Sequence, residues 1–431
     1  MKPTDALPHP AEWKTTTVGD AVELKRGISW SKEQEHLAPT AGAVPVIRIG
    51  NVQDRLELDD LVYISGLKTK SIEMKRVAVD WSIMVGSNGN RQRIGNAARV
   101  VVDADFLFAS FLMAAKPKPD SGVTPEYFYR WLRSEQVQAY LSASAEGSTG
   151  LSNLSQSFFR AMTIPYPGPE EQRAIARVLD TVDTAIERAR VALVNAKALD
   201  HSLLHELLER GAGNVQGVKR PAHWQLKRVD EVADVRAGVT LGKDVTGFNH
   251  IELPYLRVAN VQDGYLNLNT IKTVKVRLEE VERYRLEPGD VLMTEGGDLD
   301  KLGRGTLWDG QIPNCLHQNH IFSVRANRAL LDPRYFACII ESDIAKSYFT
   351  RVAKRTTNLA STNKTQVRAF RFPLPPTLEE QEQIAEIMKA SKAKLRTIEQ
   401  KEKILRQLKA SLTHDLLTGA MRVDPDLIKE E

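Results

Sequence analysis

The chain has 431 residues, of which 42% are hydrophobic and 26% are charged, as in ordinary globular proteins. Its formal net charge of +4 identifies no partner by itself. No apolar run approaches the roughly 20 residues that cross a bilayer, and the amino-terminal residues do not resemble a signal peptide. Cys315 and Cys338 have no metal-ligand spacing. We therefore expect a cytoplasmic protein of two to four domains without a metal site.

The second half of the sequence repeats the first after about 209 residues, a period too long for solenoid repeats of roughly 20–50 residues. Leu203–Leu208 returns as Leu412–Leu417, and Val46–Asp54 matches Tyr255–Asp263. A repeat of this length indicates a duplicated domain. We therefore expect an α+β fold with two pseudo-symmetric α/β domains.

Residues 1–164 contain short β-branched and aromatic runs, such as Ala43–Ile49, and a helical pattern around Pro125–Leu141. This first domain is followed by a proline-rich breaker and then by a helical segment, which together span 165–213. Acidic Glu170 and Glu171 suit the start of that helix, where the backbone dipole is positive.

The second half follows the same plan. Residues 214–372 form the second α+β domain, and 373–420 again contain a proline breaker and a long helix. Residues 421–431 form a charged tail.

Both helical segments carry apolar residues at heptad spacing over about 40 residues, or roughly 60 Å of helix. Such a pattern favours a coiled coil, although two amphipathic helices packed separately on their own domains remain an alternative. An antiparallel pair is expected, because a parallel pair would require the 214–372 domain to span about 60 Å. Leu199 and Leu408 are assigned to the same apolar stripes. The predicted interface comprises Ile175, Leu179, Val182, Ile186, Leu193, Leu203, Leu207, Ile384, Met388, Leu395, Ile398, Leu405, Leu412 and Leu416.

Two helix starts share a Pro-x-Pro motif followed by Glu-Gln-x-x-Ile-Ala. The first runs from Pro165 to Ala176, the second runs from Pro373 to Ala385, and the chain also contains the terminal sequence Leu416–Val423. With these motifs, the chain resembles the specificity subunits of type I restriction–modification systems over essentially its whole length. The first repeat departs from the terminal signature at Leu207–Ala212.

The resemblance implies a non-catalytic subunit with two target-recognition domains, each binding one half of a bipartite double-stranded DNA target. The helices would act as spacer and as docking surface for two methyltransferase subunits, and motor–nuclease subunits would join for cleavage. It implies no cofactor in this chain. The methyltransferase subunits would use S-adenosylmethionine, and the motor subunits ATP and Mg²⁺.

Catalytic motifs of those partners do not occur in this sequence. It has no Asn-Pro-Pro-aromatic or Asp-Pro-Pro-aromatic tetrad and no Gly-x-x-x-x-Gly-Lys-Ser/Thr loop. We therefore assign no catalytic residue. The alternative function is a coiled-coil scaffold whose two globular domains bind proteins.

The distribution of charge suits a DNA partner. No acidic residue occurs between Ile344 and Leu378 or between Trp81 and Val102, although such basic runs also form solvated faces. Residues identical in the two halves, such as Asn51 and Asn260, cannot distinguish two half-sites and are assigned to the scaffold. The candidate DNA contacts lie where the halves diverge. They are Asn88, Asn90, Arg91, Arg93, Lys301, Arg304, Arg351, Lys354, Arg355, Asn363 and Lys364.

Overall fold

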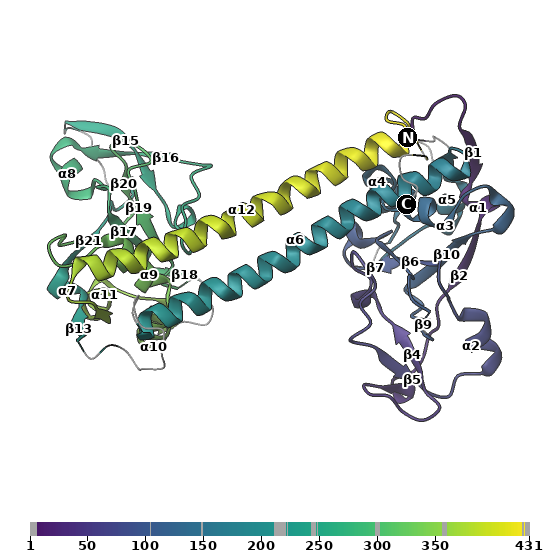
Figure 1. The fold of residues 1–431 in the computed structure, drawn as a ribbon, viewed down its shortest axis with the longest axis horizontal. Coiled ribbons are helices and arrows are strands. Elements are labelled where there is room, and N and C mark those ends of the chain that lie inside the picture. The colour runs from purple at the N-terminus through teal and green to yellow at the C-terminus, as the bar shows by residue number, and fades with distance from the viewer. Residues whose placement is uncertain are drawn as a thin grey trace. The chain divides into compact units, whose positions relative to one another are not determined.

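The computed structural model describes residues 7–103, 105–147, 150–210, 221, 223–242, 247, 249–297, 302–355, 360–424 and 426. The chain divides into two compact units. Unit 1 comprises Met1–Arg190 and Gln400–Glu431, and unit 2 comprises Val191–Glu399. Each unit combines a strand-rich domain with parts of two long helices, α6 (Pro169–Arg210) and α12 (Leu378–Leu417) (Figure 1).

Unit 1 is built on two four-stranded sheets with the orders β2-β10-β6-β8 and β3-β5-β4-β9, and two smaller strand pairs, β1-β12 and β7-β11, complete it. The first sheet contains β2 (Val22–Arg26), β10 (Leu112–Pro117), β6 (Ser82–Val85) and β8 (Ala97–Arg99). The second contains β3 (Glu35–His36), β5 (Val62–Ile64), β4 (Val44–Ile47) and β9 (Leu107–Phe108). The pairs are β1 (Lys14–Thr17) with β12 (Thr163–Tyr166) and β7 (Ser87–Asn88) with β11 (Ser152–Asn153).

The helices of unit 1 that matter for the site are α3 (Pro125–Leu132), α4 (Glu135–Ser144) and α5 (Gln156–Ala161). The single helix predicted around Pro125–Leu141 is therefore wrong. Ser134 has an extended backbone and caps α4 by accepting a hydrogen bond from the Val137 amide, which separates α3 from α4.

Unit 2 repeats this topology. Its main sheet has the order β14-β21-β17-β19, and a second sheet has the order β16-β15-β20. The main strands are β14 (Ala233–Ala237), β21 (Ile321–Ala326), β17 (Asp290–Thr294) and β19 (Gly305–Trp308). The second sheet contains β16 (Lys272–Arg277), β15 (His250–Leu256) and β20 (Leu316–His317). Smaller sheets pair β13 (Gln225–Arg228) with β24 (Arg371–Leu374), and join β18 (Gly296–Gly297), β23 (Ala360–Ser361) and β22 (Lys354–Arg355).

Helices α9 (Pro333–Glu341), α10 (Asp343–Val352) and α11 (Lys364–Ala369) correspond to α3, α4 and α5. The predicted fold of two repeated α/β domains with long helices is therefore confirmed.

A buried glutamine attaches each long helix to its domain. Gln172 donates to the carbonyls of Gly122 and Pro167, both at 2.8 Å, and accepts from the Thr124 amide at 2.8 Å. Gln381 makes the equivalent bonds with Leu330, Pro375 and Asp332, at 3.1, 3.0 and 2.8 Å. Because a buried amide must satisfy both its oxygen and its nitrogen, this arrangement fixes the position of each helix start. It gives the helix-start motif a structural role.

Within each unit, α6 and α12 pack against each other in opposite directions. In unit 1, Ile175 and Leu179 near the start of α6 share a core with Leu416 and Leu417 at the end of α12. In unit 2, the end of α6 shares a core with the start of α12 through Leu204, Leu207, Leu208, Ile384 and Met388. The predicted antiparallel pair is therefore confirmed.

The apolar stripe is interrupted by polar residues. Leu199 is 64% exposed and Leu408 is 45% exposed, so their assignment to the stripe is wrong. The regular 4-3 spacing places Asp200 and Lys409 at these points instead, and each leucine lies one residue, or about 100°, away from it. Among the other predicted interface residues, Ile175, Leu179, Ile186, Leu207, Ile384, Met388 and Leu416 are buried, whereas Val182, Leu193, Leu203, Leu395, Ile398, Leu405 and Leu412 are half-buried.

Candidate nucleic-acid interface

Two exposed basic residues of unit 2 lie in the short ladder formed by β22, β23 and β18. Lys354 and Arg355 are both exposed, and they pair with Ser361 and Ala360. Strand β18 approaches this ladder so closely that a Cβ on Gly296 would lie 2.7 Å from the Ala360 carbonyl oxygen. The glycine is therefore required for the close approach of the two strands. This approach anchors the two exposed cations to the body of the domain.

Residues on either side of this ladder have structural roles of their own. Asn363 caps α11 by accepting from the Gln366 amide at 2.9 Å, and Lys364 is half-buried at the first position of that helix. The Arg351 guanidinium lies 5.8 Å from the ring centroid of Tyr348. Tyr348 belongs to an aromatic cluster with Phe349 and Phe370, whose ring centroids are 5.0–5.2 Å apart. Arg351 thus lies beside a packed aromatic cluster.

The corresponding position in unit 1 has a different chemistry. There β7 pairs with β11, and Glu146 forms a bridge with Asn153. The sequence between Ala145 and Ser155 contains Glu146 and no lysine or arginine. The two units therefore carry different polar groups on equivalent backbone.

The candidate residues of unit 1 are held by local hydrogen bonds. Arg91 donates to the carbonyls of Ser142 and Ala143, at 3.0 and 3.1 Å, and to that of Ala145, so that it satisfies the end of α4. Arg93 donates to the Val52 carbonyl at 3.1 Å.

Asn88 accepts from the Asn90 amide at 2.7 Å, and Asn90 accepts from the Gln92 amide at 3.0 Å. These bonds give the segment 88–93 a defined conformation. Their role at DNA stays a prediction.

In the equivalent segment of unit 2, Arg304 donates to the Gln262 side chain at 2.9 Å. Lys301 lies outside the described residues.

The asparagines shared by the two halves organise equivalent loops. Asn51 accepts from the Arg48 amide and donates to the carbonyls of Glu57 and Asp60, at 2.8, 2.9 and 2.9 Å. Asn260 accepts from the Arg257 amide at 2.9 Å and donates to the carbonyls of Asn267 and Thr270 at 2.8 and 3.1 Å. Since both side chains are buried and satisfied by the backbone, these contacts support their assignment to the scaffold.

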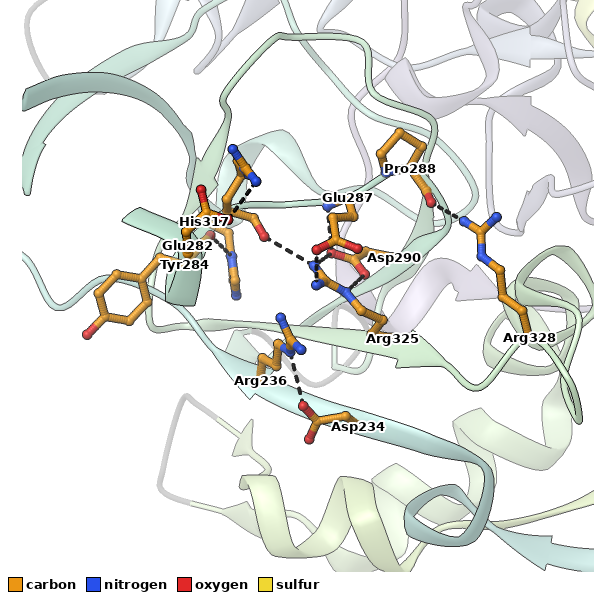
Figure 2. Close-up of polar contacts among 11 residues, drawn as sticks. Asp234, Arg236, Glu282, Tyr284, Glu287, Pro288, Asp290, His317, Arg325 and Arg328 are labelled. Atoms are coloured by element: carbon orange, nitrogen blue, oxygen red, sulfur yellow. Dashed lines mark hydrogen bonds and ion pairs between the residues drawn. The ribbon is translucent and has the colours of Figure 1, made fainter. Parts of the chain in front are cut away.

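A buried polar network that the sequence alone does not indicate connects strands of unit 2. Figure 2 shows Arg325 reaching the Asp290 carboxylate, with its Nε and Nη2 each 2.8 Å from a carboxylate oxygen. Arg325 also donates to the Arg285 carbonyl at 3.1 Å and contacts Glu287. Asp290 is only 1% exposed, so this bidentate pair connects β17, β21 and the loop before β17.

His317 lies beside this network, 1% exposed, with Nδ1 3.1 Å from the Tyr284 carbonyl oxygen (Figure 2). Because only a protonated nitrogen can donate to a carbonyl, Nδ1 carries the hydrogen of the neutral ring. Among the described residues, Nε2 has no hydrogen-bond partner. Burial lowers the pKa of His317 to about 4, against the opposing effects of the Tyr284 carbonyl and Asp290.

The described residues contain no group of three or more His, Cys, Asp or Glu that could hold a metal ion. Within the same part of the chain, no helix is long and apolar enough to cross a membrane.

A family model described as the type I restriction modification DNA specificity domain matches residues 10–196 and 221–409. The chain belongs to this family. Each of the two matched stretches contains one strand-rich domain and part of one long helix, as the duplication requires. The resemblance found in the sequence is therefore confirmed, and this chain is a type I specificity subunit by family.

Known members of this specificity-subunit family match nearly the full chain. The StySPI specificity subunit of Salmonella potsdam is 23% identical, covering 96% of this chain and 89% of its own length. The EcoKI specificity subunit of Escherichia coli K12 is also 23% identical, with 98% and 93% covered. The crystal structure of the S subunit from M. genitalium shares the fold, with a TM-score of 0.59 at 16% identity, covering 96% of this chain and 99% of that one.

Proposed function

We propose that this chain is the non-catalytic DNA-specificity subunit of a type I restriction–modification complex. Residues 1–164 and 214–372 are its two target-recognition domains, and each reads one half of a bipartite double-stranded DNA target. Segments 165–213 and 373–420 act as helical spacers. The observation that carries this proposal is that equivalent backbone presents Lys354 and Arg355 in one unit and Glu146 in the other. Two readers that share a scaffold but differ in their polar loops suit a target with two different halves.

The proposed complex requires other subunits for its chemistry. Two methyltransferase subunits dock on the helices of this chain and use S-adenosylmethionine, and motor–nuclease subunits use ATP and Mg²⁺ for cleavage. This chain supplies the choice of DNA sequence.

Lys354 and Arg355 of the β22–β23 ladder, together with Lys364 at the start of α11, should bind DNA phosphates. Replacing Lys354, Arg355 and Lys364 together with alanine should weaken binding to all DNA sequences, because phosphate contacts carry no sequence information. The slope of log K against log salt should fall by about 1 for each lost contact. Binding is measured by fluorescence anisotropy at several salt concentrations.

The matched control replaces three exposed lysines of α12, Lys394, Lys401 and Lys403, and should leave the slope as it is. A triple variant with an unchanged slope would remove the β22–β23 ladder from the DNA interface. Absence of any DNA binding by the complex would instead favour the protein-scaffold function.

Leu199 and Leu408 are equivalent in the repeat, and both are exposed on helices, which suits a docking surface for the two methyltransferase subunits. Val194 and Ile404 are also exposed, at 57% and 51%, on α6 and α12 respectively. In unit 1, a cleft of about 1120 Å³ is lined by both helices, by α3 and by the exposed Val101 and Val102. Apolar groups left in water on otherwise polar helices favour burial by a partner.

Replacing both Leu199 and Leu408 with arginine should therefore abolish co-purification with the methyltransferase subunits, while the thermal unfolding midpoint of the free chain stays within about 2 °C. Asn195→Arg with Gln407→Arg adds the same charge at exposed helical positions and is the matched control. Normal assembly of the leucine variant would place docking elsewhere.

A further inference from the structure

The contact surfaces of α6 and α12 contain charged residues at two positions of the repeat. At each of these positions, the residue of α6 and the equivalent residue of α12 have opposite charges. Asp183 of α6 corresponds to Lys392 of α12, and Lys409 of α12 corresponds to Asp200 of α6. The first correspondence lies near the helix starts, and the second lies toward the helix ends. Charge has therefore been inverted between two copies of one structural unit.

In unit 1, an anion on α6 lies between two cations. Asp183 accepts from Lys409 of α12 at 2.6 Å and from Arg130 of α3 at 2.5 Å. Arg130 is buried and also contacts Asp180. Burial raises the pKa of Asp183, but Arg130 and Lys409 outweigh it, so the pKa is lowered and the carboxylate stays charged.

In unit 2, a cation on α12 pairs with an anion at the end of α9, and Asp200 of α6 also acts on it electrostatically. Lys392 Nζ is 2.6 Å from both carboxylate oxygens of Glu341, at the end of α9. Burial lowers the pKa of Lys392, but Glu341 and, more weakly, Asp200 raise it. Asp200 also accepts from Ser391 of α12 at 2.6 Å. This arrangement has the opposite polarity to that of unit 1.

The apolar stripes of the two helices are alike in their end turns. Ile175 corresponds to Ile384, Leu179 to Met388 and Leu207 to Leu416, whereas Ala189 and Ala196 correspond to the larger Ile398 and Leu405. A helix paired antiparallel with a second copy of itself would keep the apolar packing of these end turns. However, α6 would then place Asp183 against Asp200, and α12 would place Lys392 against Lys409. Like charges juxtaposed in a partly desolvated interface oppose association.

We propose that these inverted charges select the pairing of α6 with α12 and disfavour the pairing of either helix with the same helix of a second chain. The charged positions on each helix are complementary to the other helix of the same chain. They are repulsive toward the same helix of a second chain. In this role the charges determine which helix is the partner, while the apolar residues of the end turns supply attraction that both pairings share.

The test exchanges the two charges toward the helix ends in the full chain. The variant Asp200→Lys with Lys409→Asp keeps composition and net charge, but places like charges together in the native α6–α12 pair. It also places opposite charges together in α6–α6 and α12–α12 pairs. The matched control, Asp200→Asn with Lys409→Gln, removes both charges without creating repulsion. Thermal unfolding and light scattering at several protein concentrations are measured at low and high salt.

The exchanged variant should unfold at least about 4 °C below the neutral control at low salt, with a smaller difference at high salt. Its mass should rise toward that of a dimer with increasing concentration, whereas the control stays monomeric. A variant as stable as the control would overturn the proposal. So would a destabilised variant that stays monomeric, because the charges would then contribute stability without choosing the partner.

If the exchanged variant fails to fold, the single substitutions decide. Lys409→Asp must unfold below Lys409→Gln, and Asp200→Lys must unfold below Asp200→Asn. Equal midpoints within either pair would overturn the proposal.

Discussion

Unit 2 should lose about 2–3 kcal/mol of stability through His317 alone between pH 7.5 and pH 4.5. The folded pKa of His317, about 4, lies below the ordinary value of 6.5. Between these values the unfolded chain binds a proton that the folded chain does not. The contribution of His317 is therefore complete above pH 6.5 and is lost as the pH falls toward 4. Protonation would place a charged imidazolium in a site that is only 1% exposed.

His317→Phe should remove this part of the pH dependence. Phenylalanine is chosen because the repeat equivalent of His317 is Phe108, which is fully buried in β9. Urea unfolding of both proteins at the two pH values gives the difference directly, so that other titrating groups cancel. His205→Phe, at an exposed position of α6, is the matched control and should keep the dependence of the natural chain. An equal loss of stability in the His317→Phe variant and in the natural chain would contradict the assignment.

The long helices could be predicted from the sequence because heptad spacing directly reports which side of a helix is apolar. The antiparallel direction followed from chain connectivity. The sequence misleads at Leu199 and Leu408, because in each helix a leucine lies directly before the polar residue that occupies the stripe position. Asp200 and Lys409 occupy those positions because their partners lie on another helix, and heptad spacing contains no information about such partners.

The roles of individual polar residues could be predicted less well from the sequence. Arg91 lies in a carboxylate-free stretch, which is typical of a DNA-binding surface, yet it bonds carbonyls more than 50 residues away at the end of α4. Similarly, the Asp290–Arg325 pair joins neighbouring strands separated by 35 residues. Such pairings depend on the sheet register, which local sequence does not specify.

Comparison of the two halves of the sequence predicts residue roles better. Identity between the halves predicts a scaffold role for Asn51 and Asn260, and their hydrogen bonds to the backbone support it. It also identifies the charge inversion between Asp183 and Lys392, although only the contacts show that these residues face charged partners.

An exchange of one domain tests most directly whether each repeat reads one half of the DNA target. Residues 214–372 are replaced by the corresponding domain of a specificity subunit with a different target. The methyltransferase complex is then assembled and its methylated sites are mapped across a genome. The native chain and a chain with an exchanged 1–164 domain are the controls.

One half of the methylated target should change with each exchange. The other half should stay as in the native chain, because the other domain and both long helices are retained. The two exchanges should change opposite halves. If an exchange altered both halves, or left both unchanged, the assignment of one recognition domain to each half-site would be wrong.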